Sequence, residues 1–215
     1  MKKIVLVTLI LVGLFSINKS AWAGNDWEYW SHYEVVSSIC NNLDFKVKPE
    51  LRYNNDFKNY YYIHLDIGLD WKVKDWFILS PYYQHVNEKK KGDWEVEYRP
   101  HLSATFKWKL FGLNFSDRNR LEYRIKEDKD FFRYRNKLMV ELPKFTQFRI
   151  QSYVAEELFY DFAANELNKN RIYAGLNFKV VKNINAGIYY IFESRKKKAE
   201  WSDVNVLGSA LKYSF

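Results

Sequence analysis

The chain of 215 residues lacks long apolar runs and has only one cysteine. Its longest apolar run covers residues 4–15, about twelve residues, whereas a helix needs roughly twenty to cross a bilayer. This excludes a membrane protein built from helices. The single Cys40 excludes an internal disulfide, and we expect it to be a buried or free thiol.

The apolar run belongs to a segment with the three parts of a secretory signal peptide. Lys2 and Lys3 precede the run, and a polar stretch leads from it to Ala21-Trp22-Ala23. The last three residues form an Ala-x-Ala cleavage site. We therefore predict a signal peptide at 1–23 and a single barrel domain at 24–215. Loss of the three lysines in this segment lowers the formal net charge from +8 to +5.

The sequence also lacks the motifs of metal, phosphate and nucleotide sites. It has no metal-ligand spacing and no phosphate-binding glycine loop, so we expect no metal and no cofactor. Two basic clusters, Lys89-Lys90-Lys91 and Lys196-Lys197-Lys198, would suit nucleic acid, but export removes that partner. We expect these lysines to face lipopolysaccharide phosphates or solvent.

Aromatic residues are abundant: 8 Trp, 17 Tyr and 16 Phe make up 19% of the chain. Transmembrane barrels hide their apolar face in alternation and gather aromatics at the two membrane interfaces. The C-terminal segment alternates in this way, with one face formed by Leu207, Ser209, Leu211, Tyr213 and Phe215. A strand that ends on an aromatic residue resembles the signal read by the barrel-assembly machinery. We predict that Leu211, Tyr213 and Phe215 form this signal.

Similar alternation recurs along the chain. It predicts eleven strands, at residues 27–37, 43–53, 60–72, 76–86, 94–108, 113–125, 131–142, 148–160, 170–180, 184–195 and 204–215. We expect tight turns at 74–75, 111–112, 143–144 and 182–183, and longer outer loops at 54–59, 87–93, 126–130, 161–169 and 196–202. The pattern predicts an all-β, antiparallel up-and-down transmembrane β-barrel of about 10–12 strands in the outer membrane of a Gram-negative cell.

Two features of the strand pattern need an explanation. Bacterial single-chain barrels have an even number of strands, so we expect segment 27–37 to lie outside the wall. Pro49, Pro81 and Pro100 fall inside predicted strands, where proline removes a ladder donor. We expect local bulges at these prolines. A soluble sandwich with free edges is the alternative explanation.

Several segments resemble an uncharacterised bacterial family, the domain-of-unknown-function family numbered 2490, over essentially the whole mature chain. The segments are Asp26-Trp27-Glu28-Tyr29-Trp30, Gly92-Asp93-Trp94, Arg99-Pro100-His101-Leu102, residues 107–112, residues 117–124 and residues 131–138. The resemblance implies an exported barrel. It implies no activity and no site residues.

If the apolar face meets lipid, the charged face lines the lumen. The central charge cluster that we predict consists of Arg99, Arg118, Arg120, Glu122, Arg124, Arg133, Arg135, Lys137 and Glu141. The other predicted lumen residues are Lys46, Lys48, Arg52, Lys107, Arg149, Arg171, Lys179, Lys212, Asp44, Glu50, Asp66, Asp70, Glu95, Glu97, Glu157 and Glu193.

This lumen supports two interpretations. Buried charges must be partnered, so the interior can be a structural filling of ion pairs. Arginine also binds carboxylate and phosphate bidentately, so the surplus of cations can form a narrow passive channel with a weak preference for small anionic solutes. We favour the channel as the function, and both interpretations can hold together.

An enzymatic alternative rests on His101 and Ser103, which lie two residues apart and share one face of a strand. A similar His-x-Ser element serves outer-membrane lipid hydrolases, where a third polar residue orients the imidazole. Asn114, Asp117 or Asn119 could be that residue. The alternation directs His101 into the lumen, away from membrane lipid, and this argues against catalysis.

We predict that the mature protein begins at Gly24, fractionates with outer membranes and migrates faster on gels before boiling than after. The signal peptide and the strand pattern motivate this prediction. Mass spectrometry, density-gradient fractionation and gel mobility measure it. Recovery of the protein in the soluble periplasmic fraction would contradict it.

Overall fold

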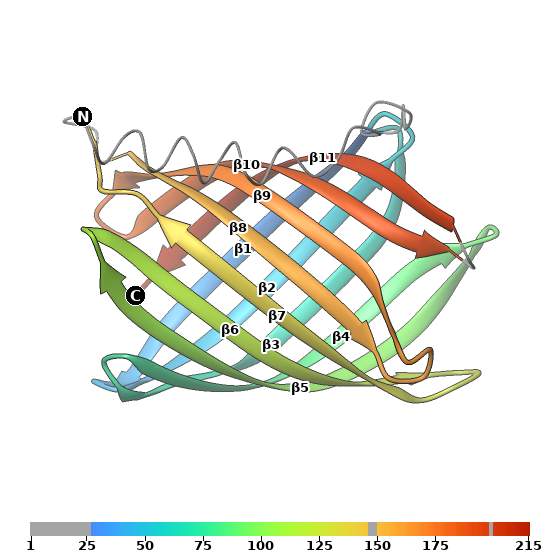
Figure 1. Ribbon diagram of the computed structural model, residues 1–215, viewed down its shortest axis with the longest axis horizontal. Coiled ribbons are helices and arrows are strands. Elements are labelled where there is room, and N and C mark those ends of the chain that lie inside the picture. Colours follow the sequence, from blue (N-terminus) through green and yellow to red (C-terminus); the bar gives the residue numbers. More distant parts are fainter. Residues whose placement is uncertain (1–26, 146–149, 198–199) are drawn as a thin grey trace.

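The computed structural model describes residues 27–145, 150–197 and 200–215 as a closed barrel of eleven strands (Figure 1). The predicted signal peptide, the cleavage site before Gly24, and Arg149 lie outside the described residues. The strands are β1 (Trp27–Cys40), β2 (Leu43–Asn54), β3 (Asn59–Lys74), β4 (Phe77–Lys90), β5 (Asp93–Leu110), β6 (Leu113–Lys126), β7 (Phe131–Glu141), β8 (Gln151–Asp161), β9 (Glu166–Val181), β10 (Ile184–Lys197) and β11 (Glu200–Ser214). In the described part of the chain, no helix is long and apolar enough to cross a membrane.

Every strand pairs with its chain neighbours in an antiparallel ladder, and β1 closes the ring by pairing in parallel with β11. The β1–β11 ladder runs from Trp27 opposite Asn205 to Val36 opposite Ser214. The expectation that segment 27–37 lies outside the wall was therefore wrong. An odd number of strands makes the first and last run in the same direction, and a parallel ladder still satisfies their backbone groups. Closure leaves no free sheet edge.

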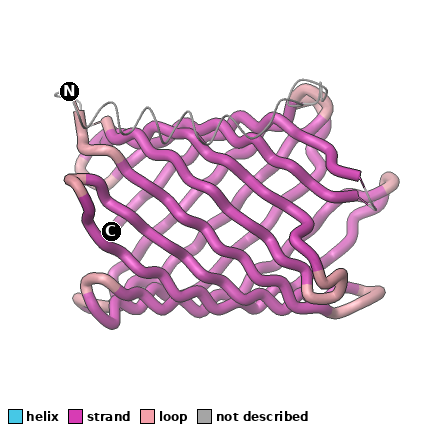
Figure 2. Tube along the Cα trace, viewed as in Figure 1, coloured by secondary structure: helices cyan, strands magenta, loops and turns pink. Residues whose placement is uncertain are grey.

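The strands extend further than predicted, so most connections are short (Figure 2). The predicted loop at 87–93 shrinks to Lys91 and Gly92, both with positive φ. Phe111 and Gly112 form a second hairpin turn with positive φ at both residues, as a type I′ turn requires. The predicted tight turn at 143–144 belongs instead to the longer connection 142–150. The predicted contrast between long outer loops and tight turns is thus weaker than expected.

The three strand prolines do not form bulges, which corrects our expectation. Each lies at a gap in one of its two ladders: Pro49 on the β1 side, Pro81 on the β3 side and Pro100 on the β6 side. The register before and after each gap is unchanged. Because proline has no N–H to donate, the wall loses pairing on one side and keeps it on the other.

The predicted alternation holds, with apolar side chains outside and polar ones inside. On β3, Leu65 and Ile67 are exposed, whereas His64 and Asp66 are buried. On β11, the exposed face comprises Leu207, Leu211 and Tyr213, and Phe215 directly after the strand is exposed as well. Tyr61 departs from the alternation, because it is the extra residue at the register shift between β2 and β3. Its hydroxyl donates to Glu28.

Phe215 completes the seam between the first and last strands. Its backbone N–H donates to the Val36 carbonyl (3.0 Å), and its ring packs edge-on against Tyr213 while 74% exposed. We expect deletion of Phe215 to reduce the amount of barrel assembled in cells, measured as the fast-migrating form on unboiled gels. The control is Phe111→Ser, which removes an aromatic ring of similar exposure at a turn. Normal levels of the truncated barrel would contradict the proposed signal.

Candidate functional site

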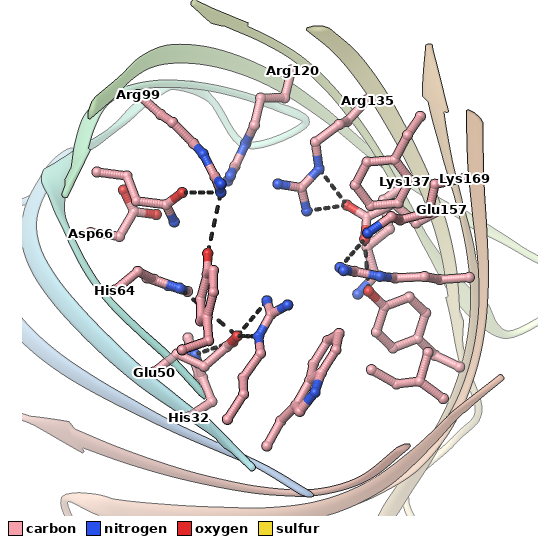
Figure 3. Close-up of a pocket in the computed structure, with 18 of the residues that line it drawn as sticks. His32, Glu50, His64, Asp66, Arg99, Arg120, Arg135, Lys137, Glu157 and Lys169 are labelled. Carbon is pink, nitrogen blue, oxygen red and sulfur yellow. Dashed lines mark hydrogen bonds and ion pairs between the residues drawn. The ribbon is translucent and has the colours of Figure 1, made fainter. Parts of the chain in front are cut away.

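The barrel encloses a cavity of about 600 Å³ lined by side chains from all eleven strands. Figure 3 shows the labelled side chains pointing from the wall toward this central space. They include His64 on β3, Arg99 on β5, Arg135 on β7 and Glu157 on β8. They point inward because successive side chains of a strand alternate between its two faces, so every second residue reaches the interior.

Charged side chains of neighbouring strands face one another in register, forming what we call the charge row. Its members, from β6 to β10, are Arg118, Lys137, Glu157, Arg171 and Glu193. Glu157 lies 2.8 Å from Arg118 and 3.6 Å from Arg171. Arg171 in turn pairs with Glu193. Glu157 thus lies between cations of the two adjacent strands, and Glu193 pairs with cations of β9 and of its own strand.

Other buried carboxylates also pair with several cations. Glu122 is fully buried and pairs with Arg133 (2.6 Å) and Arg135 (2.7 Å). Glu97 accepts two hydrogen bonds from Arg99, at 2.7 and 2.8 Å, and also pairs with Arg124. These are the fork-like contacts for which the planar guanidinium is suited.

Arg135 connects Glu122 to the charge row, because its second guanidinium nitrogen lies 2.7 Å from Glu157. On the far side of the row, Arg195 pairs with Glu193 and lies 2.7 Å from Glu28 on β1. The Glu28 carboxylate also accepts hydrogen bonds from the Trp30 indole (2.8 Å) and the Tyr61 hydroxyl. Ion pairs therefore run continuously from β6 through β10 to β1.

Anions and cations occupy different depths in this network. Thirteen of the residues that line the cavity are Lys or Arg, and five are Asp or Glu. Glu28, Glu97, Glu122 and Glu193 are not among the lining residues, although all four are buried. They lie against the wall, covered by the guanidinium groups that they hold. The surface facing the cavity is consequently more basic than the interior as a whole.

Some lining cations have no carboxylate partner. Within the described part of the chain, Lys48 and Lys137 each lie more than 4 Å from every carboxylate, and both rest on aromatic rings. Lys137 sits 3.6 Å from the Tyr173 ring centre, and Lys48 sits 4.2 Å from that of Tyr82. Arg118 keeps one buried nitrogen, Nε, without a hydrogen-bond partner. These groups retain capacity for an anionic ligand.

A second part of the interior wall is apolar. The residues Ala155, Tyr173, Ile191 and Val206 face one another in register across β8 to β11, next to the charge row. They pack with Trp30 and Val204, and Met139, Tyr153 and Tyr189 rest against them. The cavity thus has a cationic side and an aromatic side.

The predicted charge cluster is largely brought together. Arg118, Arg120, Arg135 and Lys137 surround the same stretch of β6 and β7, in the cross-strand pairs Arg118–Lys137 and Arg120–Arg135. Glu141 lies apart, near the end of β7, where it accepts a hydrogen bond from Gln151. Three of the other predicted lumen residues are exposed and lie near strand ends: Glu95 and Lys107 on β5, and Lys179 on β9.

The sequence reasoning missed Glu28, Trp30, Lys169 and Arg195. Trp30 is central to the interior, since the Arg52 guanidinium lies 3.6 Å from its ring centre. Glu28 and Trp30 were missed because β1 was placed outside the wall. Their spacing carried a usable signal: residues 28, 30, 32 and 34 alternate with Tyr29, Ser31 and Tyr33 as in the other strands.

The hydrolase candidates do not come together. The His101 ring lies 3.0 Å from Asp66, and the Ser103 hydroxyl accepts a hydrogen bond from Arg120 (3.0 Å). Asn119 lies on the opposite face of β6 from Arg120, where it bonds with Asp117, Tyr134 and Asn136. No hydrogen bond among the described residues joins His101 to Ser103 or to Asn119. Across that same part of the chain, no group of three or more His, Cys, Asp or Glu side chains is placed to hold a metal ion.

Fold and interior together define a closed up-and-down β-barrel with an apolar outer face and an ion-paired, cation-lined cavity. The chain belongs to the family described as Protein of unknown function (DUF2490), whose model matches residues 27–204. A comparison with curated proteins finds no match.

Glu157 is the carboxylate with the most partners in the charge row, so its replacement tests how far the fold depends on the row. We expect Glu157→Gln to lower the free energy of unfolding by about 3–5 kcal/mol, because it leaves buried cations uncompensated. The control is Glu156→Gln, one residue away on the outer face, where Glu156 accepts a hydrogen bond from Asn170. Urea unfolding of both variants in lipid vesicles measures the difference. Equal stability of the two variants would contradict a structural role for the row.

Proposed function

We propose that the protein is an integral β-barrel of the cell outer membrane. The support is its outer face, where large apolar side chains are exposed all around the barrel, among them Leu65, Leu102, Leu138, Ile188 and Leu207. Contiguous exposed apolar surface of this extent marks contact with lipid or partner proteins. In an outer-membrane barrel, such a band faces the hydrocarbon region.

Within that membrane, we propose that the cavity is a narrow passive channel with a weak preference for small anionic solutes. The observation that carries the proposal is the composition of the lining, thirteen cations against five carboxylates. A positive potential in a narrow, partly desolvated bore attracts anions and raises a barrier to cations. Lys48, Lys137 and Arg118 add unpaired donors along the path.

The proposed partners follow from this location. Residues 89–91, at the rim between β4 and β5, include the exposed Lys89 and Lys91, which suit the phosphates of lipopolysaccharide. The outward side chains of Leu211, Tyr213 and Phe215 suit recognition by the barrel-assembly machinery. Small anionic solutes would be the transported partners.

A barrel with a purely structural role is the second candidate. It is favoured by the complete burial of Glu122 and Glu193, each of which pairs with several cations. A closed, ion-paired interior would give this arrangement without transport. Conductance measurements separate the two candidates.

We expect the protein in planar bilayers to carry small currents whose reversal potential shifts toward that of the anion. The preference should weaken as salt rises above about 0.1 M, where the Debye length falls to about 10 Å. Arg120→Gln combined with Arg135→Gln should reduce the preference and leave a folded barrel of lower stability, because both arginines pair with the buried Glu122. The control is the pair Lys89→Gln and Lys109→Gln, which removes the same charge from exposed positions.

Cation-selective currents in the unaltered protein would overturn the proposed preference. Absence of any current, together with a loss of stability in the double arginine variant, would favour the structural candidate.

A further inference from the structure

Aromatic residues and glycines alternate in register across five strands of the interior wall, forming what we call the aromatic row. Tyr153 on β8 pairs with Gly175 on β9, which pairs with Tyr189 on β10. Tyr189 pairs with Gly208 on β11, and Gly208 pairs with Trp30 on β1. Tyr153, Tyr189 and Trp30 all line the cavity.

The glycines of this row let the tyrosine rings lie against the wall. A Cβ atom added at Gly175 would fall 2.5 Å from the Tyr153 ring carbons, and one added at Gly208 would overlap the Tyr189 ring. Each ring therefore covers the backbone of the adjacent strand. A side chain at either glycine would push the ring into the cavity, so the glycines keep this wall flat.

The two tyrosines of the aromatic row are available for hydrogen bonding and for stacking with a ligand. Neither Tyr153 nor Tyr189 has a hydrogen bond or a stacked ring or cation among the described residues. Their neighbours behave otherwise, because the Arg52 guanidinium covers the Trp30 ring and Lys137 covers the Tyr173 ring. Within the described residues, the two rings thus line the cavity without a stacked ring, a cation or a hydrogen-bond partner.

Along the strands that the two rows share, the charge row lies two inward-facing residues away from the aromatic row. Every second residue of β8 faces inward. Toward the beginning of this strand, Glu157 of the charge row is followed by Ala155 and then by Tyr153 of the aromatic row. Four residues of strand correspond to about 13 Å. The unpaired Lys137 lies directly opposite Glu157 on β7, and Arg118 lies opposite Lys137 on β6. A ligand of modest length would reach both the cations and the rings.

We infer that the cavity takes organic anions with a flat apolar body, such as aromatic carboxylates or sulfonates, in preference to small inorganic or aliphatic anions. The carboxylate or sulfonate would lie against Lys137 and Arg118, and the flat body against Tyr153 and Tyr189. Guanidinium groups bind such oxyanions, and aromatic rings prefer offset stacking with another ring. This inference names the solute class for the proposed channel and rests on that function for its physiological meaning.

Three probes test the inference on the full barrel refolded in detergent micelles: 2-naphthoate, acetate and 2-naphthalenemethanol. Acetate lacks the flat body and the alcohol lacks the charge. Calorimetric titration, with protein-free micelles as the blank, should show 2-naphthoate binding at least about tenfold more tightly than either of the others, because one molecule then uses both the rings and the cations. Equal binding of 2-naphthoate and acetate, or of 2-naphthoate and the alcohol, would overturn the inference.

Two adjacent tyrosines provide a matched pair of variants. Tyr189 faces the cavity, whereas Tyr190 lies on the outer face, where its hydroxyl donates to Asn205. Tyr189→Ser should weaken 2-naphthoate binding about fivefold, the size of a lost aromatic contact. Tyr190→Ser should leave it unchanged, and Tyr189→Phe should retain it. Equal weakening by both serine variants would assign the binding to the outer surface and overturn the inference. If Tyr189→Ser does not assemble, the three-probe comparison on the unaltered protein still decides.

Conductance separates this inference from the proposed function. Binding of 2-naphthoate without any current would contradict the proposed channel and support the inferred binding site. Anion currents that 2-naphthoate neither blocks nor shifts, together with no preferential binding of 2-naphthoate, would support the proposed channel and contradict the inferred binding site.

Discussion

Carboxylates buried between cations of neighbouring strands hold the interior of this barrel together. A carboxylate with almost no solvent contact is costly unless it is paired and hydrogen-bonded. Glu122, Glu157 and Glu193 meet this requirement with guanidinium groups from adjacent strands, so each also fixes the lateral relation between those strands. Since Glu122 and Glu193 lie outside the cavity lining and thirteen Lys and Arg side chains belong to it, a wall held by ion pairs also presents a positive surface to the cavity. The stability of the wall and the positive charge of the cavity surface therefore have the same origin.

Register determines which chemistry each part of the cavity offers. Along β8 the inward residues change from Glu157 to Ala155 to Tyr153, and their cross-strand partners change in the same order. The result is a cationic zone, an apolar zone and a flat aromatic zone in succession. A shift of one residue would direct these side chains to the outer face, where Glu157 and Arg171 would lie among exposed apolar side chains. The same pairing thus specifies the wall and the order of its lining.

The sequence was sufficient to predict the barrel, the approximate strands and the inward face, because alternation with period two is a local signal. It also suggested the grouping of Arg118, Arg120, Arg135 and Lys137, since adjacent antiparallel strands bring their central residues together. Closure between β1 and β11 could not be predicted, because parallel pairing of distant segments leaves no local pattern. The partners of each charge depend on register. Register also explains why Asn119 was a poor candidate beside Ser103: Ser103 faces Arg120, and this places Asn119 on the other face.

The parallel seam between β1 and β11 has a topological consequence. Because eleven strands cross the barrel, β1 begins at one rim and β11 ends at the other. A barrel with an even number of strands returns both chain ends to a single rim. Here, Trp27 and Phe215 lie toward opposite rims of the barrel. If the wall spans a membrane, the two ends of this domain face two different compartments.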